Sequence, residues 1–355
     1  MHVFVTIPLD QGGTAPAQVV RGLIADLFGP RRPPWPGGHY AVRTWDRADG
    51  GDLLQVSLAS DTASADEARD RAGEAARAHG LRPTAAEVPL EEVPSPLWNS
   101  GVAGPGFDAA SKRLCAAVAP ALARAASELV HETGKAGAYR LALRLMAANA
   151  GAAVLESEQR HLTSRDFGEL VSLRLLSYRS HYEGAKNARA TDPDAFERRC
   201  AGFYEALGAY ARDLVRDCAA SPVPAAGDEP ARTWVEAVRG RFGPLRDLCR
   251  DGLIAHEGPT LDAYGGGGGA RPPASAFHAD LSEAMSELLH RNPDFMAYRI
   301  QTSLLYSCLH TLGFTLAERY LFCYILARAN EEVAGRGAEE LAQGLDAVAR
   351  EVAAG

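Results

Sequence analysis

The sequence predicts an α+β protein in which a small unit of mixed strands and helices precedes a large, mainly helical region. Strand-like and helical patterns alternate over residues 1–100, whereas strand signals nearly vanish after Gly106. A strand signal is an alternation of apolar and polar residues, and a helical signal is an apolar residue every three or four positions. The change of period along the chain therefore predicts two regions of different architecture.

Residues 1–100 contain predicted elements in the order strand, helix, strand, strand, helix, strand. The strands are expected at 2–7, 39–45, 53–59 and 81–90, and the helices at 15–28 and 64–78. The segment DRADGGD between the second and third strands is typical of a hairpin turn. A βαββαβ order predicts a ferredoxin-like unit.

Residues 101–355 are predicted to form a helical region. Its segments have helical periodicity and are bounded by Gly, Pro or capping residues. Residues 264–275, YGGGGGARPPAS, are predicted to form a flexible surface loop, because glycine and proline disfavour regular structure. We therefore expect a domain boundary near residue 100.

Composition and charge exclude several classes of protein. A net charge of −8 over 355 residues disfavours nucleic acid as the main partner, since phosphate binding needs a concentrated basic surface. No stretch approaches the roughly 18 uninterrupted apolar residues of a membrane span. The six cysteines contain no C-x-x-C pair, and the chain opens with a strand-like segment. These features predict a cytoplasmic protein with reduced thiols.

Common cofactor motifs are absent from the sequence. It contains no phosphate-binding loop, no G-x-S-x-G elbow, no H-E-x-x-H pair and no cysteine and histidine cluster with zinc spacing. We therefore expect an enzyme of this sequence to use no metal and no cofactor. Its rate enhancement would come from acid/base chemistry and from positioning.

One candidate segment is LSYRSHYE, from Leu176 to Glu183. Tyr178 and Tyr182 are one helical turn apart, and so are Ser177 and His181. The polar groups either line a functional site or belong to a solvated helix face.

The second candidate segment is YRIQTSLLYSCLH, from Tyr298 to His310. Helical spacing gives it an apolar face with Ile300, Leu304 and Leu305 and an adjoining polar face with Ser303, Tyr306, Ser307 and His310. The polar face is either a row of catalytic groups or part of a core helix whose polar atoms find partners in neighbouring helices.

A third candidate is Arg43 in HYAVRTW, where strand alternation puts Ala41 and Trp45 on the same face. The arginine is either a surface residue whose stem is covered by the indole or an anion anchor for a peptide or carboxylate.

The order of these features resembles the elimination domain of lantibiotic dehydratases, in the free-standing form found in thiopeptide gene clusters. The resemblance covers nearly the whole chain, and its motifs are the opening strand, WPGGHYAVRTW with Arg43, LSYRSHYE, and SLLYSCLHTLGF with AERYLFCYILAR. In glutamate-eliminating members a histidine occupies the position of Tyr306, and an Asn-Arg pair that of Leu309 and His310. LLQVSLA also lacks the arginine-rich ending of the corresponding strand. These departures imply altered chemistry.

Relatives with altered chemistry include the thiopeptide pyridine synthases, which join two dehydroalanines of a ribosomal peptide in a formal [4+2] aza-cycloaddition. Loss of water and of the leader peptide then forms a pyridine-centred macrocycle. The resemblance implies Tyr306, Ser303 and His310 as catalytic residues. The substrate-binding residues that it implies are Arg43, Tyr178, Ser180, His181, Tyr182, Arg299 and Tyr320. Arg198, Arg199 and Arg212 are candidates for leader binding.

Two other functions also stay open. One is an elimination enzyme that makes dehydro amino acids from glutamylated residues, and the other is a non-catalytic protein that binds the leader peptide. All three functions imply a precursor peptide as partner, with neither nucleic acid nor membrane, and a homodimer is compatible with each.

Overall fold

The computed structural model describes residues 1–9, 16–33, 35–36, 38–45, 51–61, 64–97, 101–132, 134–188, 193–221, 223–257 and 282–354. The strands are β1 (His2–Pro8), β2 (His39–Trp45), β3 (Asp52–Ala59), β4 (Thr84–Val88), β5 (Val102–Ala103) and β6 (Ala255–His256). The helices are α1 (Pro16–Phe28), α2 (Ala65–Ala78), α3 (Phe107–His131), α4 (Lys135–Glu156), α5 (Gln159–Leu162), α6 (Phe167–Ala188), α7 (Pro193–Ala220), α8 (Glu229–Arg250), α11 (Glu283–His290), α12 (Pro293–Thr311), α13 (Leu316–Ala334) and α14 (Ala338–Ala354), with a short 3-10 helix at Leu90–Glu92. The loop predicted at 264–275 lies outside the described residues.

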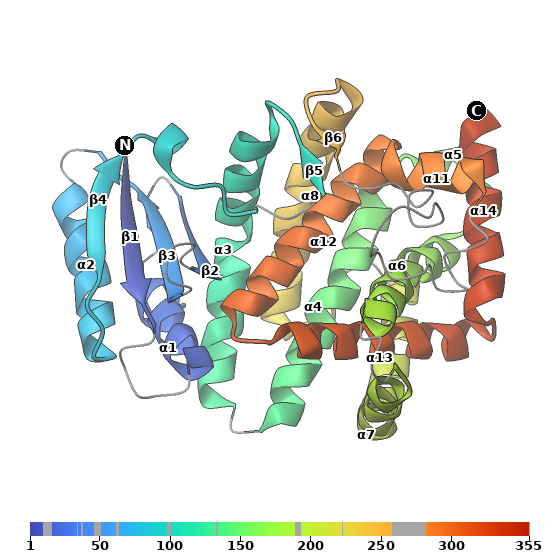
Figure 1. Ribbon diagram of the computed structural model, residues 1–355, viewed down its shortest axis with the longest axis horizontal. Coiled ribbons are helices and arrows are strands. Elements are labelled where there is room, and N and C mark those ends of the chain that lie inside the picture. The colour runs from blue at the N-terminus through green and yellow to red at the C-terminus, as the bar shows by residue number, and fades with distance from the viewer. Residues whose placement is uncertain are drawn as a thin grey trace.

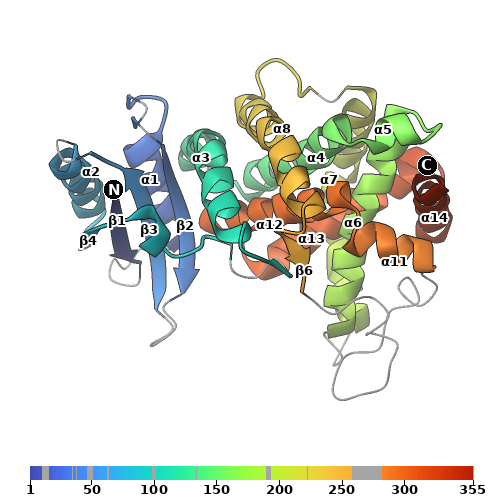
Figure 2. The ribbon, with the colours of Figure 1, turned by 90° about the horizontal axis from the view of Figure 1, so that it is seen from above.

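The N-terminal sheet has the strand order β2-β3-β1-β4, and every pairing is antiparallel. Because side chains alternate along a strand, one face carries the buried residues Val3, Val5 and Ile7 of β1 beside Leu54 and Val56 of β3. Helices α1 and α2 lie on one side of this sheet (Figures 1 and 2). The α+β class predicted from the sequence is confirmed.

The β2 edge of the sheet meets the helical region. Helix α3 packs against α1 and β2, and the end of α12 also contacts β2. The backbone N–H of Arg43 donates to Thr311 Oγ1 at 3.0 Å, and Arg21 Nε donates to the Leu312 carbonyl at 2.7 Å. Gly313 follows with φ of +87°, and a Cβ there would lie 2.3 Å from the Cβ of Ala17. Only glycine therefore lets the end of α12 sit this close to α1.

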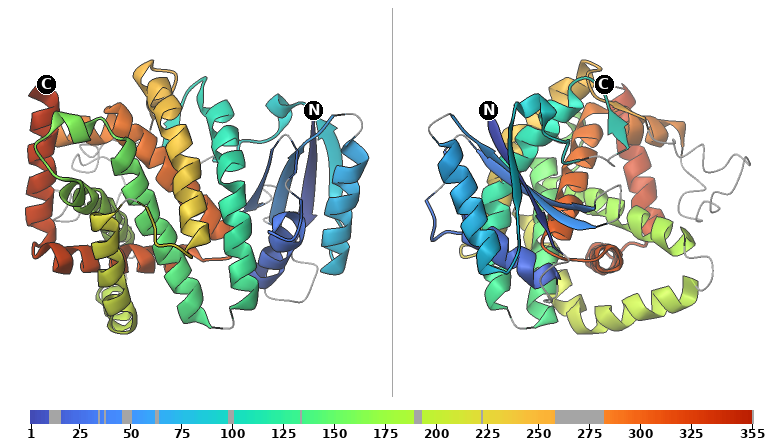
Figure 3. Two further views of the ribbon diagram at one scale, coloured as in Figure 1. Left: turned by 180° about the vertical axis from the view of Figure 1, so that it is seen from behind. Right: turned by 60° about the vertical axis from the view of Figure 1, so that its left-hand side comes forward.

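Helix α12 crosses the helical region and carries the second candidate segment (Figure 1). It packs against α8, α4 and α11, while α8 lies between α3 and α4 (Figure 3). Asn292 caps its first turn by accepting from the N–H groups of Asp294 and Phe295. A capping box of Thr315 and Glu318 starts the next helix, α13. These caps, with Gly313, fix where α12 begins and ends.

Within the described residues, no helix combines the length and apolar character that crossing a membrane requires. All six cysteines belong to the described residues, and all are free thiols.

Candidate functional site

The C-terminal half of α12 has a buried apolar face and a partly exposed polar face. Ile300, Leu304 and Leu305 are completely buried. Ser303, Tyr306, Ser307 and His310 are all partly exposed, one or two turns apart along the helix. The division into two faces predicted from the sequence is confirmed.

Tyr306 is the contact point of three helices. Its hydroxyl lies 2.6 Å from His181 Nδ1 of α6 and 3.4 Å from Cys323 Sγ of α13. The Arg319 guanidinium, also from α13, lies over the tyrosine ring at 4.5 Å from its centre. A phenol can exchange protons with a bound group when a basic nitrogen lies beside its hydroxyl and a cation lies over its ring. This exchange needs no metal ion.

Burial raises the pKa of Tyr306 well above its usual value, and the proximity of Cys323 adds to the rise while Arg319 opposes it. Tyr306 is consequently a neutral phenol at neutral pH and acts as a hydrogen-bond donor. Burial lowers the pKa of His310, and the charge of Arg43 lowers it further. The His310 imidazole is consequently neutral at neutral pH and has one nitrogen that accepts.

Arg43 forms an ion pair within the sheet. Its Nε lies 2.9 Å from Asp52 Oδ1, and its Nη2 donates to Asp52 Oδ2. The partner is on β3, next to the β2 strand that carries Arg43. Neither sequence interpretation of Arg43 included this carboxylate partner. Substrate binding by Arg43 stays a prediction.

Tyr178 and Tyr182, which the sequence predicts to contact substrate, are both 0% exposed in this structure, and substrate contact by them stays a prediction. The Tyr178 hydroxyl donates to the Met146 carbonyl at 2.8 Å. The Tyr182 ring stacks on Phe196 at 5.8 Å and meets Tyr324 edge-on at 4.9 Å. They pack α6 against its neighbours.

The other polar stripe of α6 does reach α12. Ser177 Oγ lies 2.9 Å from the Tyr298 hydroxyl, and one turn later His181 contacts Tyr306. Ser180 is partly exposed beside them. The spacing of Ser177 and His181 in the sequence therefore matches a helix–helix contact that ends at Tyr306.

The remaining predicted residues lie in different places. Tyr320 is next to the site, and its hydroxyl accepts a hydrogen bond from Arg319 Nη2 at 3.0 Å. Arg299 instead reaches toward α11, where its Nη2 lies 3.1 Å from the Leu289 carbonyl.

The residues predicted to bind the leader lie on α7. Arg198 and Arg199 are exposed, and Arg212 forms an ion pair with Glu332 at 2.9 Å. Their exposure leaves Arg198 and Arg199 accessible to a peptide, and leader binding on α7 stays a prediction.

Sequence reasoning missed Arg319 and Cys323. They are four residues apart and share a face of α13, which spacing could have indicated. Their approach to Tyr306 depends on how α13 packs against α6 and α12, which spacing does not show. In the described part of the chain, no group of three or more His, Cys, Asp or Glu residues has an arrangement that could hold a metal ion.

No protein-family model matches the sequence, and no curated protein is similar to it in sequence. Several solved structures are similar in fold, TsrL and TbtD among them. TsrL superposes with a TM-score of 0.66 at 18% identity, covering 97% of this chain and 98% of that chain. TbtD, a pyridine synthase from thiomuracin biosynthesis, superposes with a TM-score of 0.57 at 15% identity, covering 94% and 99%. The resemblance to pyridine synthases is confirmed at the level of the fold, along nearly the whole chain.

Proposed function

We propose that this protein is a pyridine synthase that catalyses a formal [4+2] aza-cycloaddition between two dehydroalanines of a modified ribosomal peptide. The observation that carries the proposal is the fold shared with a pyridine synthase over 94% of this chain. The position of Tyr306 between His181 and Arg319, on the partly exposed face of α12, supports it.

The proposed reaction begins when a backbone amide N–H proton moves to the amide oxygen, which creates a 2-azadiene. The two CH₂ carbons then bond to each other, and the former amide carbon bonds to the α-carbon of the second dehydroalanine. Departure of the former amide oxygen as water, and of the leader peptide as a carboxamide, leaves an aromatic pyridine. Each of these two losses also removes a proton from the ring, so the series of reaction steps needs no oxidant or reductant.

Most of the barrier is entropic, because two alkenes that are distant in a flexible peptide must meet face to face. Holding reacting groups in place contributes up to about 7–11 kcal/mol in favourable cases. The proton transfers need a neutral donor near the amide oxygen and an acceptor near the amide nitrogen. Tyr306 suits the first task and His181 the second, while Ser303 and His310 lie one turn to either side of Tyr306.

The proposal also includes the sequence-based expectations about the N-terminal topology, the domain boundary, the location of the protein, cofactor use and leader binding. Strand order and pairing support a ferredoxin-like topology for the N-terminal unit, with a domain boundary near residue 100. We also propose a cytoplasmic enzyme that needs no cofactor and binds an acidic leader through Arg198 and Arg199 on α7. Leader affinity should then fall as the salt concentration rises.

The test is incubation of the purified protein with a linear, azole-bearing peptide that has two dehydroalanines and an intact leader. Mass spectrometry should find a macrocycle and a released leader carboxamide. A second arm with a glutamylated peptide tests the elimination activity, and loss of glutamate there would contradict the proposal. Tight leader binding with no mass change in either peptide would instead support a non-catalytic binding protein.

A further inference from the structure

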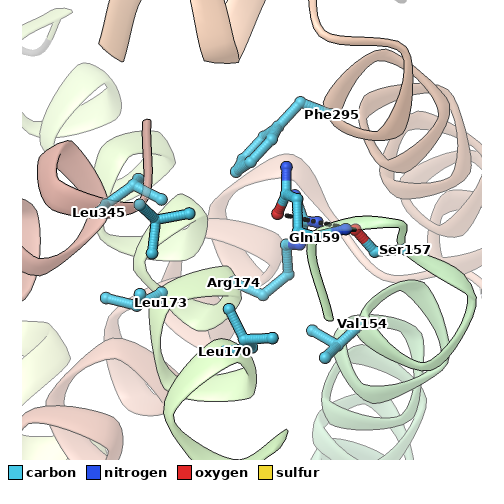
Figure 4. Close-up of a pocket in the computed structure, with 9 residues that line it drawn as sticks. Val154, Ser157, Gln159, Leu170, Leu173, Arg174, Phe295 and Leu345 are labelled. Carbon is cyan, nitrogen blue, oxygen red and sulfur yellow. Dashed lines mark hydrogen bonds between the residues drawn. The ribbon is translucent and has the colours of Figure 1, made fainter. Parts of the chain in front are cut away.

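A second polar site lies at the other end of the contact between α6 and α12. A cavity lies there between five helices (Figure 4). It is lined by the end of α4, the start of α5, the first half of α6, the start of α12, and α14. Its walls are apolar except for Ser157, Gln159 and Arg174, and it has room for about one water-sized group. Arg174 and His181 are seven residues apart on α6, which is roughly 10 Å along the helix axis. The cavity is therefore separate from the Tyr306 site.

The cavity is lined by two hydrogen-bond donors that lack acceptors. Arg174 is 2% exposed, its guanidinium lies 3.9 Å from the centre of the Phe295 ring, and its Nη2 donates to Gln159 Oε1 at 3.1 Å. Arg174 Nη1 and Gln159 Nε2 are both buried, and neither has a partner among the described residues. Buried donors in native proteins almost always have partners, so this pair of donors suits a bound acceptor.

An acceptor bound at Arg174 should also carry a negative charge. Within the described ranges, no carboxylate oxygen forms an ion pair with Arg174 at 4.0 Å or less. The nearby Asp294 uses Oδ2 to accept from Ser157 Oγ at 2.7 Å and from the Glu158 N–H at 2.8 Å. Its Oδ1 lies 3.7 Å from Arg246. A second arginine therefore shares this carboxylate, and burial lowers the pKa of Arg174 despite the opposing effect of Asp294.

We propose that this cavity binds a small anion, a halide ion or a carboxylate, between Arg174 Nη1 and Gln159 Nε2. A water molecule could accept both hydrogen bonds, but it would leave the buried guanidinium with only the Asp294 carboxylate, which Arg246 shares, as counter-charge. The bound anion would join α6 to α5 through groups that otherwise have no acceptor. The proposal goes beyond the pyridine synthase function and does not depend on it.

The test is thermal unfolding of the full chain in sodium chloride, sodium formate or sodium gluconate at equal ionic strength. Gluconate is too large for the cavity and serves as the reference anion. A ligand that binds only the native state raises the melting temperature in a saturable way, by roughly 2 °C at tenfold excess over Kd. Response to chloride alone identifies a halide site, and response to formate alone a carboxylate site. No shift with either anion relative to gluconate would overturn the proposal.

Gln159→Glu gives the sharper variant, because it puts a carboxylate where Gln159 Oε1 already accepts from Arg174. We expect this variant to melt higher than the wild type in gluconate and to lose its response to the small anion. Retention of the wild-type response would overturn the proposal. Arg140→Met is the matched control, since Arg140 stacks on Tyr210 away from the cavity, and its response should be unchanged.

A crystallographic measurement covers the case in which substitutions disturb folding. Wild-type crystals soaked in sodium bromide should show an anomalous peak within hydrogen-bonding distance of Arg174 Nη1. Bromide peaks elsewhere on the protein with none in the cavity would contradict a halide site. In that case formate must shift the melting temperature for the proposal to stand.

Discussion

The two polar faces of helix α12 have similar side chains but opposite surroundings. On one face Asp294, Tyr298, Gln301 and Thr302 are at most 3% exposed. Each has a partner on another element, such as Gln301 Nε2 with the Val238 carbonyl at 3.0 Å and Thr302 Oγ1 with Asn149 Nδ2 at 3.3 Å.

On the other face, Ser303, Tyr306, Ser307 and His310 are partly exposed. Polar residues inside an apolar helix are thus of two kinds. Those of the buried face hold the helices together, and those of the partly exposed face are the candidates for chemistry. The predictions that follow test this division.

The largest effect is expected for Tyr306→Phe on the partly exposed face. Loss of a positioned proton donor should lower the rate of macrocycle formation by about 10²–10⁴-fold, with little change in the free energy of unfolding. Initial rates from mass spectrometry measure this. The matched control Tyr210→Phe removes a hydroxyl from a tyrosine that stacks with Arg140 of α4. A Tyr306→Phe enzyme as fast as this control would show that the Tyr306 hydroxyl has no chemical role.

Asp294→Ala tests the buried face. The change leaves the Ser157 hydroxyl, the Glu158 N–H and the Arg246 guanidinium without their shared carboxylate. We expect the free energy of unfolding to fall by about 3 kcal/mol, measured by urea denaturation. Asp213→Ala should change it by about 0.5 kcal/mol or less, since that ion pair is largely exposed. Equal losses in the two variants would mean that the Asp294 network contributes no more than a surface pair.

A smaller effect is expected for Arg319→Met. The guanidinium over the Tyr306 ring lowers the pKa of the phenol. Its removal should make Tyr306 a weaker proton donor and reduce the rate by roughly tenfold. Arg328→Met is the control on the same helix, because Arg328 pairs with Glu332 on the surface. If both variants lose activity equally, the cause is the net charge of α13 and not the contact with Tyr306.

The smallest effect is a pH dependence of stability at His310. Because burial lowers its pKa in the folded state, the unfolded chain binds a proton first as the pH falls below about 6.5. The free energy of unfolding should therefore decrease as the pH falls from about 6.5 to the folded pKa, and this contribution should level off below that pKa. His310→Gln should weaken the dependence. Parallel curves for wild type and His310→Gln would rule out this contribution.

Much of the fold could be predicted because it depends on local patterns. Alternation in β1 and the 3.6-residue period of α1 and α12 were visible, as were the turn residues between β2 and β3. The polar face of α12 was also visible as a stripe.

The role of the polar face of α12 could not be predicted, because helical spacing does not distinguish a polar stripe that contacts solvent from one that contacts another helix. Tyr178 and Tyr182 have the same one-turn spacing as Ser177 and His181, yet the first pair is completely buried, whereas the second pair is partly exposed where it meets Tyr298 and Tyr306. The ion pair of Arg43 with Asp52 depended on the register of the β2–β3 hairpin, and the cation over Tyr306 depended on how α13 packs against α12.

The most direct test of the proposed reaction follows one oxygen atom. A bis-dehydroalanine substrate with ¹⁸O only in the amide carbonyl that becomes part of the ring is incubated with the wild-type protein. The proposed reaction steps predict a macrocycle without the label and a released leader carboxamide, because the labelled oxygen departs as water. A macrocycle that retains ¹⁸O, or unchanged peptide under conditions where its binding is demonstrated, would contradict the assignment as a pyridine synthase.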